Sequence, residues 1–279
     1  MRCAWKEFLS ILPNWMRAEV DKLGRDSLQE LRLRLGLPPE LVRAGPSAKL
    51  SREVTSEDLS FVVNTASRYS PWSAATAAQG YITAPGGHRI GLCGEAVIQG
   101  GQMTGMRQVT SLCIRVARDF PDIARKLQGA VGSILILGRP GSGKTTLLRD
   151  LIRQRSVLGA GSIAVVDERG ELFPQRCGFQ QGSRTDVLTG CGKQHGIEIL
   201  VRTMGPSTIA VDEITSERDC EALIKAGWCG VKLLATAHAA SKEDLLNRTI
   251  YQPLVKSHIF DTLVILQSDK SWKAERMEA

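Results

Sequence analysis

One stretch limits what this chain can fold into more than any other. It is Gly138-Arg139-Pro140-Gly141-Ser142-Gly143-Lys144-Thr145, which fits the pattern G-x-x-x-x-G-K-[ST] at every fixed position. The apolar run 133–137 before it suits a buried strand, and 146–152 after it has helical spacing. Its glycines let the backbone turn tightly toward an anion, and the amides of the first helical turn point at phosphates. The stretch therefore predicts binding of a nucleoside triphosphate.

Two side chains of this loop have distinct predicted tasks. Lys144 would reach the β- and γ-phosphates, and the hydroxyl of Thr145 would ligate Mg²⁺. The cofactors predicted here are therefore ATP and Mg²⁺, with ATP only mildly favoured over GTP because no guanine-reading motif is evident. The predicted nucleotide-binding residues are Gly138, Arg139, Pro140, Gly141, Ser142, Gly143, Lys144, Thr145 and Thr146.

Length and charge favour a soluble protein of two modest domains. The chain has 279 residues and a formal net charge of +7, which is spread along the sequence without a long Lys/Arg block. A solvated face explains this excess most simply. An acidic partner, an anionic membrane surface and nucleic acid are the alternatives.

Cysteines and hydropathy point to a reducing compartment. The seven cysteines contain no C-x-x-C pair and are predicted to be buried thiols, with neither a zinc site nor a disulfide framework expected. No apolar run approaches the length that spans a bilayer, and charges interrupt the N-terminus too early for a signal peptide. A cytoplasmic protein is expected.

The first part of the chain, residues 1–128, is predicted to be a small α+β domain. An apolar stripe over 4–23, interrupted by Pro13, indicates helix packed on its own domain, with a membrane or partner contact as the alternative. Apolar and polar residues alternate strictly over 30–35, which indicates a half-buried strand with its arginines on the solvent or interface side. The remaining expected elements are a helix from about 55 to 66, strands at 81–83, 86–98 and 109–117, and a hairpin turn at 99–102.

Residues 129–279 alternate strand and helix patterns, which predicts a parallel sheet with crossover helices. The expected strands are 133–137, 162–167, 208–212, 231–236 and 262–267, and the expected helices are 144–155, 196–204, 217–226 and 241–250.

Acidic pairs and a histidine end three of these strands. Asp167-Glu168 and Asp212-Glu213 follow apolar runs, and His238 follows a third. Because parallel strands end at one edge of a sheet, all of them should lie beside the phosphate loop. Asp212 is suited to the Mg²⁺ shell and Glu213 to the attacking water. His238 is placed to sense the γ-phosphate, although a structural histidine is the alternative.

Several of these segments resemble a known family. Val-Val-Asp-Glu-Arg-Gly-Glu, Ile-Ala-Val-Asp-Glu-Ile and Ala-Thr-Ala-His-Ala look like the acidic box, Walker B and histidine box of secretion-type hexameric ATPases. Gly-Gly-His-Arg-Ile-Gly-Leu-Cys-Gly, Ser-Leu-Cys-Ile-Arg-Val-Ala-Arg and Arg-Thr-Asp-Val-Leu resemble the stage III sporulation protein AA family more closely, from about residue 29 onward.

This resemblance implies a RecA-like ATPase domain in a ring, of the hexameric kind, behind the small domain. It implies a cytoplasmic ATPase of the mother cell, held at the membrane through partner proteins, that powers or gates the channel complex joining mother cell and forespore. Glu168 and Glu213 become the acidic-box and Walker B glutamates, and His238 the histidine-box residue. The family's N-terminal arginines, which complete the nucleotide site, suggest Arg89, Arg107 or Arg115. An interface or surface ion pair is the alternative for each arginine.

The sequence also departs from those motors. Asp212 stands where secretion ATPases commonly carry glycine, which leaves the division of roles between Glu168 and Glu213 open. Their metal-binding cysteine domain has no counterpart, so no zinc is expected. Two other functions stay open: a nucleotide-gated assembly scaffold with little turnover, and a DNA-acting ATPase, against which the missing basic stripe counts.

Overall fold

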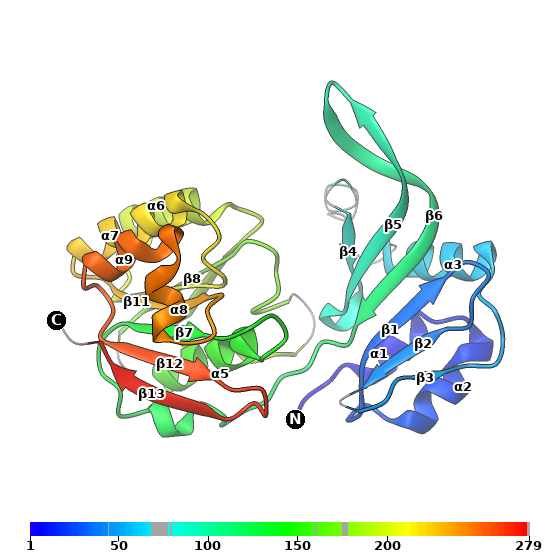
Figure 1. Cartoon of the computed structure of the whole chain (residues 1–279), viewed down its shortest axis with the longest axis horizontal. Helices are drawn as coiled ribbons and strands as arrows, with labels where there is room; N and C mark the ends of the chain where they lie inside the picture. The colour runs from blue at the N-terminus through cyan, green and yellow to red at the C-terminus, as the bar shows by residue number, and fades with distance from the viewer. Residues whose placement is uncertain (44, 68–77, 79, 160, 175–177, 278–279) are drawn as a thin grey trace. The chain divides into compact units, whose positions relative to one another are not determined.

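The chain folds into two compact units, each with its own sheet (Figure 1). The computed structural model describes residues 1–43, 45–67, 78, 80–159, 161–174 and 178–277. The first unit is formed by Met1–Asp119, and the second by Phe120–Phe173 with Phe179–Ala279. Within the described residues, no helix combines the length and apolar character needed to cross a bilayer.

The first unit is built on a six-stranded sheet in the order β3-β2-β1-β6-β5-β4, whose strand pairs are antiparallel. Its strands are β1 (Leu28–Arg34), β2 (Glu40–Arg43), β3 (Ala48–Lys49), β4 (Tyr81–Thr83), β5 (Arg89–Gln99) and β6 (Gln102–Arg115). The predicted hairpin turn is confirmed, because Gln99 pairs with Gln102 around two glycines of positive φ.

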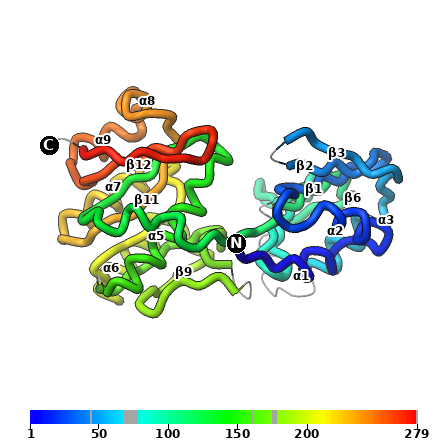
Figure 2. Tube along the Cα trace, turned by 90° about the horizontal axis from the view of Figure 1, so that it is seen from below, coloured from blue at the N-terminus to red at the C-terminus, as the bar shows by residue number. Residues whose placement is uncertain are grey.

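Helices cover one face of this sheet, as Figure 2 shows. They are α1 (Trp5–Ser10), α2 (Asn14–Leu23) and α3 (Ser56–Ser67). The short 3-10 turn η1 (Pro85–Gly87) also belongs to this unit, whereas η2 (Arg125–Leu127) belongs to the second unit. Phe8, Leu12 and Met16 of the N-terminal stripe are buried against Leu31 and Leu33. The stripe is therefore core of its own unit, and the membrane or partner contact considered for it is not needed to explain it.

The second unit has a seven-stranded sheet in the order β13-β12-β7-β11-β10-β8-β9, parallel except for β13. Its strands are β7 (Ile134–Leu137), β8 (Ile163–Asp167), β9 (Thr185–Thr189), β10 (Thr208–Val211), β11 (Lys232–Ala237), β12 (Thr262–Leu266) and β13 (Trp272–Arg276). The predicted parallel sheet with crossover helices is confirmed.

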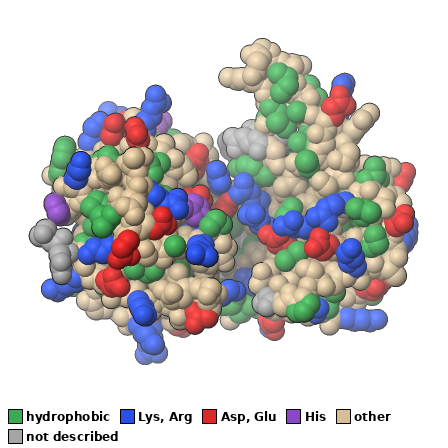
Figure 3. Space-filling view, in the orientation of Figure 1, with side chains coloured by type: hydrophobic (Ala, Val, Ile, Leu, Met, Phe, Trp, Pro, Cys, Tyr) green, Lys and Arg blue, Asp and Glu red, His purple; other side chains and the backbone are tan. Residues whose placement is uncertain are grey.

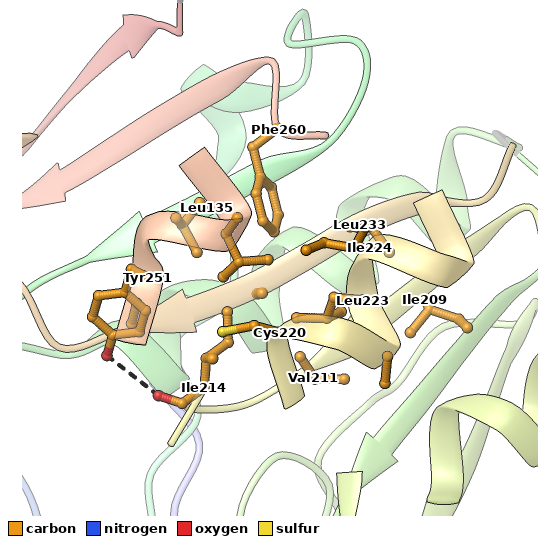
Figure 4. Packing of buried hydrophobic residues seen from close by; sticks show 14 of the residues in the cluster. Leu135, Ile209, Val211, Ile214, Cys220, Leu223, Ile224, Leu233, Tyr251 and Phe260 are labelled. Atoms are coloured by element: carbon orange, nitrogen blue, oxygen red, sulfur yellow. Dashed lines mark hydrogen bonds between the residues drawn. The ribbon is translucent and has the colours of Figure 1, made fainter. Parts of the chain in front are cut away.

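Helices pack on both faces of this sheet and make two cores. Residues of α5 (Lys144–Val157) are buried against one face. The other face is covered by α6 (Lys193–Met204), α7 (Glu217–Trp228) and α9 (Gln252–Lys256), as the close-up in Figure 4 shows for α7 and its neighbours. Strands β7, β8, β10 and β11 send alternate side chains into the two cores, which is why their sequences read as continuous apolar runs.

Some expectations are corrected. The helix expected over 241–250 ends early, as α8 (Lys242–Asn247), and η3 (Thr249–Tyr251) and α9 follow it. Strands β2, β3, β9 and β13 were not expected at all, because they are short, polar or at a sheet edge.

The prediction of buried cysteines was wrong for most of them. Cys220 is buried, Cys93 and Cys229 are exposed, and Cys3, Cys113 and Cys191 are partly exposed. Cys177 falls outside the described residues. Within the part of the chain that the structure describes, no group of three or more His, Cys, Asp or Glu side chains is placed to hold a metal.

Candidate active site

The strand order brings the predicted functional residues to one edge. Strands β7, β11, β10 and β8 are successive neighbours in the sheet and run parallel. The phosphate loop leaves β7, His238 follows β11, Asp212-Glu213 follows β10, and Glu168 follows β8. All of them therefore lie at the carboxyl edge of four adjacent strands, which is where parallel sheets bind ligands.

The loop has the backbone that phosphate binding requires. Gly141 and Gly143 have φ of 75° and 103°, the left-handed region that other residues avoid, and Gly143 caps α5, which begins at Lys144. A Cβ added to Gly138 would collide with Ser142 Oγ and lie 3.1 Å from Leu266 Cβ, so the loop is closely packed around this glycine. Arg139, Pro140 and Gly141 are exposed at the loop tip.

One polar atom inside this loop has no partner. Among the described residues, Ser142 Oγ is a buried side-chain oxygen without a hydrogen bond. A hydroxyl buried without a partner costs free energy unless a ligand or ion satisfies it. Together with the open amides at the start of α5, this orphaned oxygen fits the loop to a phosphate group.

Lys144, His238 and Glu213 form a hydrogen-bonded chain. The Lys144 ammonium is buried and donates to the carbonyls of Gly138 (2.9 Å) and Arg139 (3.1 Å) and to His238 Nδ1 (3.0 Å). Since an ammonium only donates, Nδ1 accepts, and Nε2 carries the proton toward Glu213 Oε1 at 2.7 Å. Burial lowers the pKa of Lys144, against the pull of the nearby Glu213 and Asp212 carboxylates.

Asp212 is held by two hydroxyls. Thr145 donates to its Oδ2 at 2.8 Å and Thr236 donates to its Oδ1 at 3.0 Å. Burial raises the pKa of Asp212, and these hydrogen bonds partly offset the rise. A carboxylate beside the hydroxyl of Thr145 is the donor set that a divalent cation takes at a phosphate loop, so the residues present fit Mg²⁺.

Glu213 sits on a strained backbone that Thr236 holds. Its φ is 44°, a left-handed value that a glutamate adopts at a cost of about 1–2 kcal/mol. The Glu213 amide donates to Thr236 Oγ1 at 2.9 Å, and the amide of Ile214 donates to the Thr236 carbonyl at 2.8 Å. Strain of this kind gathers at functional sites, where the surroundings fix it. Thr236 thus orients both Asp212 and Glu213.

Tyr251 hydrogen-bonds the backbone of two connections at the same edge. Its hydroxyl accepts from the amide of His238 at 3.2 Å and donates to the carbonyl of Ile214 at 3.3 Å, the contact drawn in Figure 4. The ring is buried in the core beneath. The connection after β11 and the one after β10 are therefore tied together by one phenol.

The two carboxylates of the other acidic pair differ: Asp167 is buried and structural, and Glu168 is half-exposed. Asp167 is buried and accepts the amides of Glu171 (2.8 Å) and Phe173 (2.9 Å), which fixes the following turn, and burial raises its pKa to about 6. Glu168 is half-exposed and is ion-paired with the buried ammonium of Lys193, at the start of α6.

Sequence reasoning missed Thr236, Tyr251 and Lys193. A hydroxyl within the apolar strand two residues before His238 was a signal for Thr236. Nothing in the sequence pattern marked Tyr251, or Lys193, which lies 25 residues from its partner.

The three candidate arginines belong to the sheet of the first unit. Arg89 and Arg115 are opposite partners on β5 and β6; Arg89 stacks over Tyr81 at 4.1 Å, and Arg115 pairs with Glu30 at 3.3 Å. Arg107 lies farther out on the hairpin, ion-paired with Glu95.

Comparisons with known proteins show the family of the chain. The family described as sporulation stage III, protein AA, matches residues 6–275. Stage III sporulation protein AA from Bacillus subtilis (strain 168) is 35% identical over 280 residues, covering 95% of this chain and 91% of the relative.

Solved structures share the fold at low identity. The pilus retraction motor PilT with bound ADP aligns over 95% of this chain and 82% of its own, with 16% identity and a TM-score of 0.63. The Legionella pneumophila ATPase DotB aligns over 95% and 80%, with 15% identity and a TM-score of 0.58. The fold is thus that of the RecA-like secretion and pilus ATPases, and the chain belongs to the stage III sporulation protein AA family.

Proposed function

We propose that this protein is a Mg²⁺-dependent ATPase that converts ATP and water to ADP and phosphate. One observation carries the proposal: the hydrogen-bonded chain from Lys144 through His238 to Glu213, beside the Thr145–Asp212 pair. It joins a phosphate-binding cation to a carboxylate suited to water, with an imidazole between them. ATP binding alone would need the lysine but not the glutamate.

The loop Gly138–Thr145 holds the phosphates in this proposal. Its backbone amides and the positive end of α5 face the anion, and Ser142 Oγ gains the partner it lacks. Lys144 exchanges its bonds to the loop carbonyls for phosphate oxygens, which compensate its buried charge better than neutral carbonyls do. Thr145 and Asp212 would hold Mg²⁺, which neutralises phosphate charge and polarises the bonds around phosphorus.

Glu213 is the group that orients and deprotonates the attacking water. Thr236 presents it, and His238 holds one of its oxygens, so the other oxygen is left for water. When Lys144 turns to phosphate, it releases His238 Nδ1, so the imidazole reports occupancy of the loop to Glu213. Glu168 is the second carboxylate of the site, held by Lys193.

The sites are completed between copies of the chain in a ring of six. Arg89 or Arg115 of a neighbouring copy would stabilise charge on the transferring phosphoryl group. The cross-strand pairing of Arg89 with Arg115 supports this, because it places two guanidinium groups of one copy close together.

In the cell, this ring would act in the mother cell, peripheral to the membrane through partner proteins. It would power or gate the channel complex that joins mother cell and forespore. Membership of a sporulation family and the shared fold with secretion and pilus motors support this role.

Steady-state ATP hydrolysis as a function of protein concentration, with oligomeric state followed in parallel, tests the proposal. Specific activity should rise as copies assemble, because one copy supplies the loop and another the arginine. Lys144→Ala should remove nucleotide binding and hydrolysis together. Tight ATP binding with assembly but no turnover at any concentration would replace the motor with a nucleotide-gated scaffold.

A further inference from the structure

Exposed apolar side chains of the second unit gather at the amino edge of its sheet. This edge comprises the helix ends and connections that lead into the parallel strands. Trp228 is 75% exposed, Val131 76%, Val157 72%, Leu158 56% and Met204 50%. Single exposed apolar residues are ordinary on protein surfaces, but an exposed indole within a group of this size is not.

The strand order arranges these residues as a row. Val131 precedes β7, Trp228 precedes β11, Met204 precedes β10, and Val157 and Leu158 precede β8. These four strands are successive neighbours in the sheet. The five side chains therefore project from adjacent connections, and we call them the apolar row.

Basic residues accompany the apolar row. Three carboxylates also lie among the described residues of this edge: Asp122 in the connection before β7, Glu275 beside Arg276 on β13, and Asp261, which accepts the amide of Ser133 at 2.6 Å. The exposed basic residues of this edge are Arg184, Arg202, Lys225, Lys232, Lys256 and Arg276. Figure 3 shows hydrophobic side chains next to Lys/Arg side chains, with some Asp/Glu side chains among them, on the left-hand side of this unit, where β12 begins.

Helix dipoles account for part of this charge. Arg202, Lys225 and Lys256 lie in the last turns of α6, α7 and α9, where cations are favoured. The dipoles do not account for Lys232, which opens β11, or for the exposure of Trp228 and Val131.

We propose that this amino edge docks on an anionic phospholipid surface. An indole ring and lysine or arginine side chains find partners at the same depth of a bilayer, the headgroup region, while the neighbouring apolar side chains enter the acyl boundary. The positive charge is complementary to anionic headgroups. The phosphate loop lies at the opposite, carboxyl edge of the same sheet, so a docked molecule keeps that edge clear of the bilayer.

Flotation of the full-length protein with vesicles tests this directly. Vesicles of phosphatidylcholine with one third phosphatidylglycerol are compared with phosphatidylcholine alone, at low salt and at 0.5 M NaCl. The wild type should float with the anionic vesicles, and salt should release it. Each basic residue near such a surface adds about fivefold to partitioning, so Lys225→Gln with Lys232→Gln should lower it by at least about tenfold. Trp228→Ser should lower it by a similar factor.

Matched controls distinguish binding through this edge from nonspecific adsorption to vesicles. Ile98→Ser removes an exposed apolar side chain from the first unit, and Lys273→Gln removes an exposed charge from β13; both should float like the wild type. Equal losses in the controls and in the edge variants would overturn the proposal. A wild type that stays unbound to anionic vesicles at low salt would also overturn it and point to an acidic protein instead. Hydrolysis plays no part in the assay, so its outcome is independent of the proposed ATPase function.

Discussion

His238 and Glu213 are joined by a hydrogen bond of 2.7 Å between Nε2 and Oε1, and each follows a different strand of the sheet. The other nitrogen of the same imidazole accepts from Lys144, so the histidine is not a surface residue that happens to lie near the site. It connects the phosphate-binding lysine with the carboxylate proposed to act on water.

Thr236→Val should disable the site without changing its shape. Valine is nearly isosteric but neither accepts from the Glu213 amide nor donates to Asp212, so both partners are left unsatisfied. We expect the free energy of unfolding to fall by about 1–3 kcal/mol and turnover to fall by about a hundredfold. Thr208→Val, at the buried opposite end of β10, is the control and should keep wild-type turnover. Equal turnover in the two variants would contradict the role given to Thr236.

Lys193→Met should lower kcat more than it raises KM for ATP. The buried ammonium holds Glu168, and its loss removes a charge-assisted bond of about 1.5 kcal/mol, or about tenfold in rate. Lys193→Arg should restore most of the rate, whereas Lys273→Met on the exposed β13 should leave kcat unchanged. A variant with normal kcat and lowered stability would make the pair purely structural.

The effect of replacing each candidate arginine on kcat should depend on the position of that arginine in the sheet. Arg89→Ala and Arg115→Ala should each lower kcat by about a thousandfold and leave nucleotide binding intact, as loss of a phosphoryl-stabilising arginine does. Arg107→Ala should stay within about twofold of wild type, because Arg107 lies farther out on the hairpin than the Arg89–Arg115 pair. Kinetics at saturating ATP check this. Finding that Arg107 alone is required would contradict the assignment.

His88 should make the first unit sensitive to acid. It is fully buried, accepts the amide of Ala117 at Nδ1 and contacts the carbonyl of Ala4 through Nε2, and burial lowers its pKa to about 4. The folded state therefore favours the neutral ring. The stability this gives is fully present above the unfolded pKa of about 6.5 and is lost as pH falls from there toward 4.

By pH 5.0 that loss should reach about 2 kcal/mol relative to pH 7.5. Urea unfolding of the first unit at the two pH values measures it. His88→Gln should flatten the difference, and His195→Gln, on the exposed face of α6, should keep it. A wild type as stable at pH 5.0 as at pH 7.5 would show that His88 is not held neutral.

Much of this site was predictable because its residues end strands that read as apolar runs. Strands β7, β8, β10 and β11 are buried on both faces, so the sequence marks each of them and the polar residue that follows. Sheet edges lack that signal. β9 is partly exposed and polar, and β13 is almost wholly exposed, so neither has a hydrophobic pattern to find.

Side-chain contacts at the site were less predictable than strand ends. Thr236 reads as part of an apolar run, yet its hydroxyl satisfies two groups of another connection. The left-handed backbone of Glu213 is likewise invisible in the sequence, since nothing but the fixed partners around a glutamate makes that conformation tolerable. That Cys220 alone of the described cysteines is buried was missed, because apolar neighbours in sequence do not ensure burial in space.

The central claim is that Glu213 acts on the attacking water, and Mg²⁺-dependent ATP hydrolysis by Glu213→Gln tests it most directly. Glutamine keeps the shape but cannot take a proton, so hydrolysis should fall by about a hundredfold or more while ATP binding persists. Glu217→Gln, on the exposed first turn of α7, should hydrolyse ATP like the wild type. Undiminished hydrolysis by the assembled Glu213→Gln protein would contradict the account.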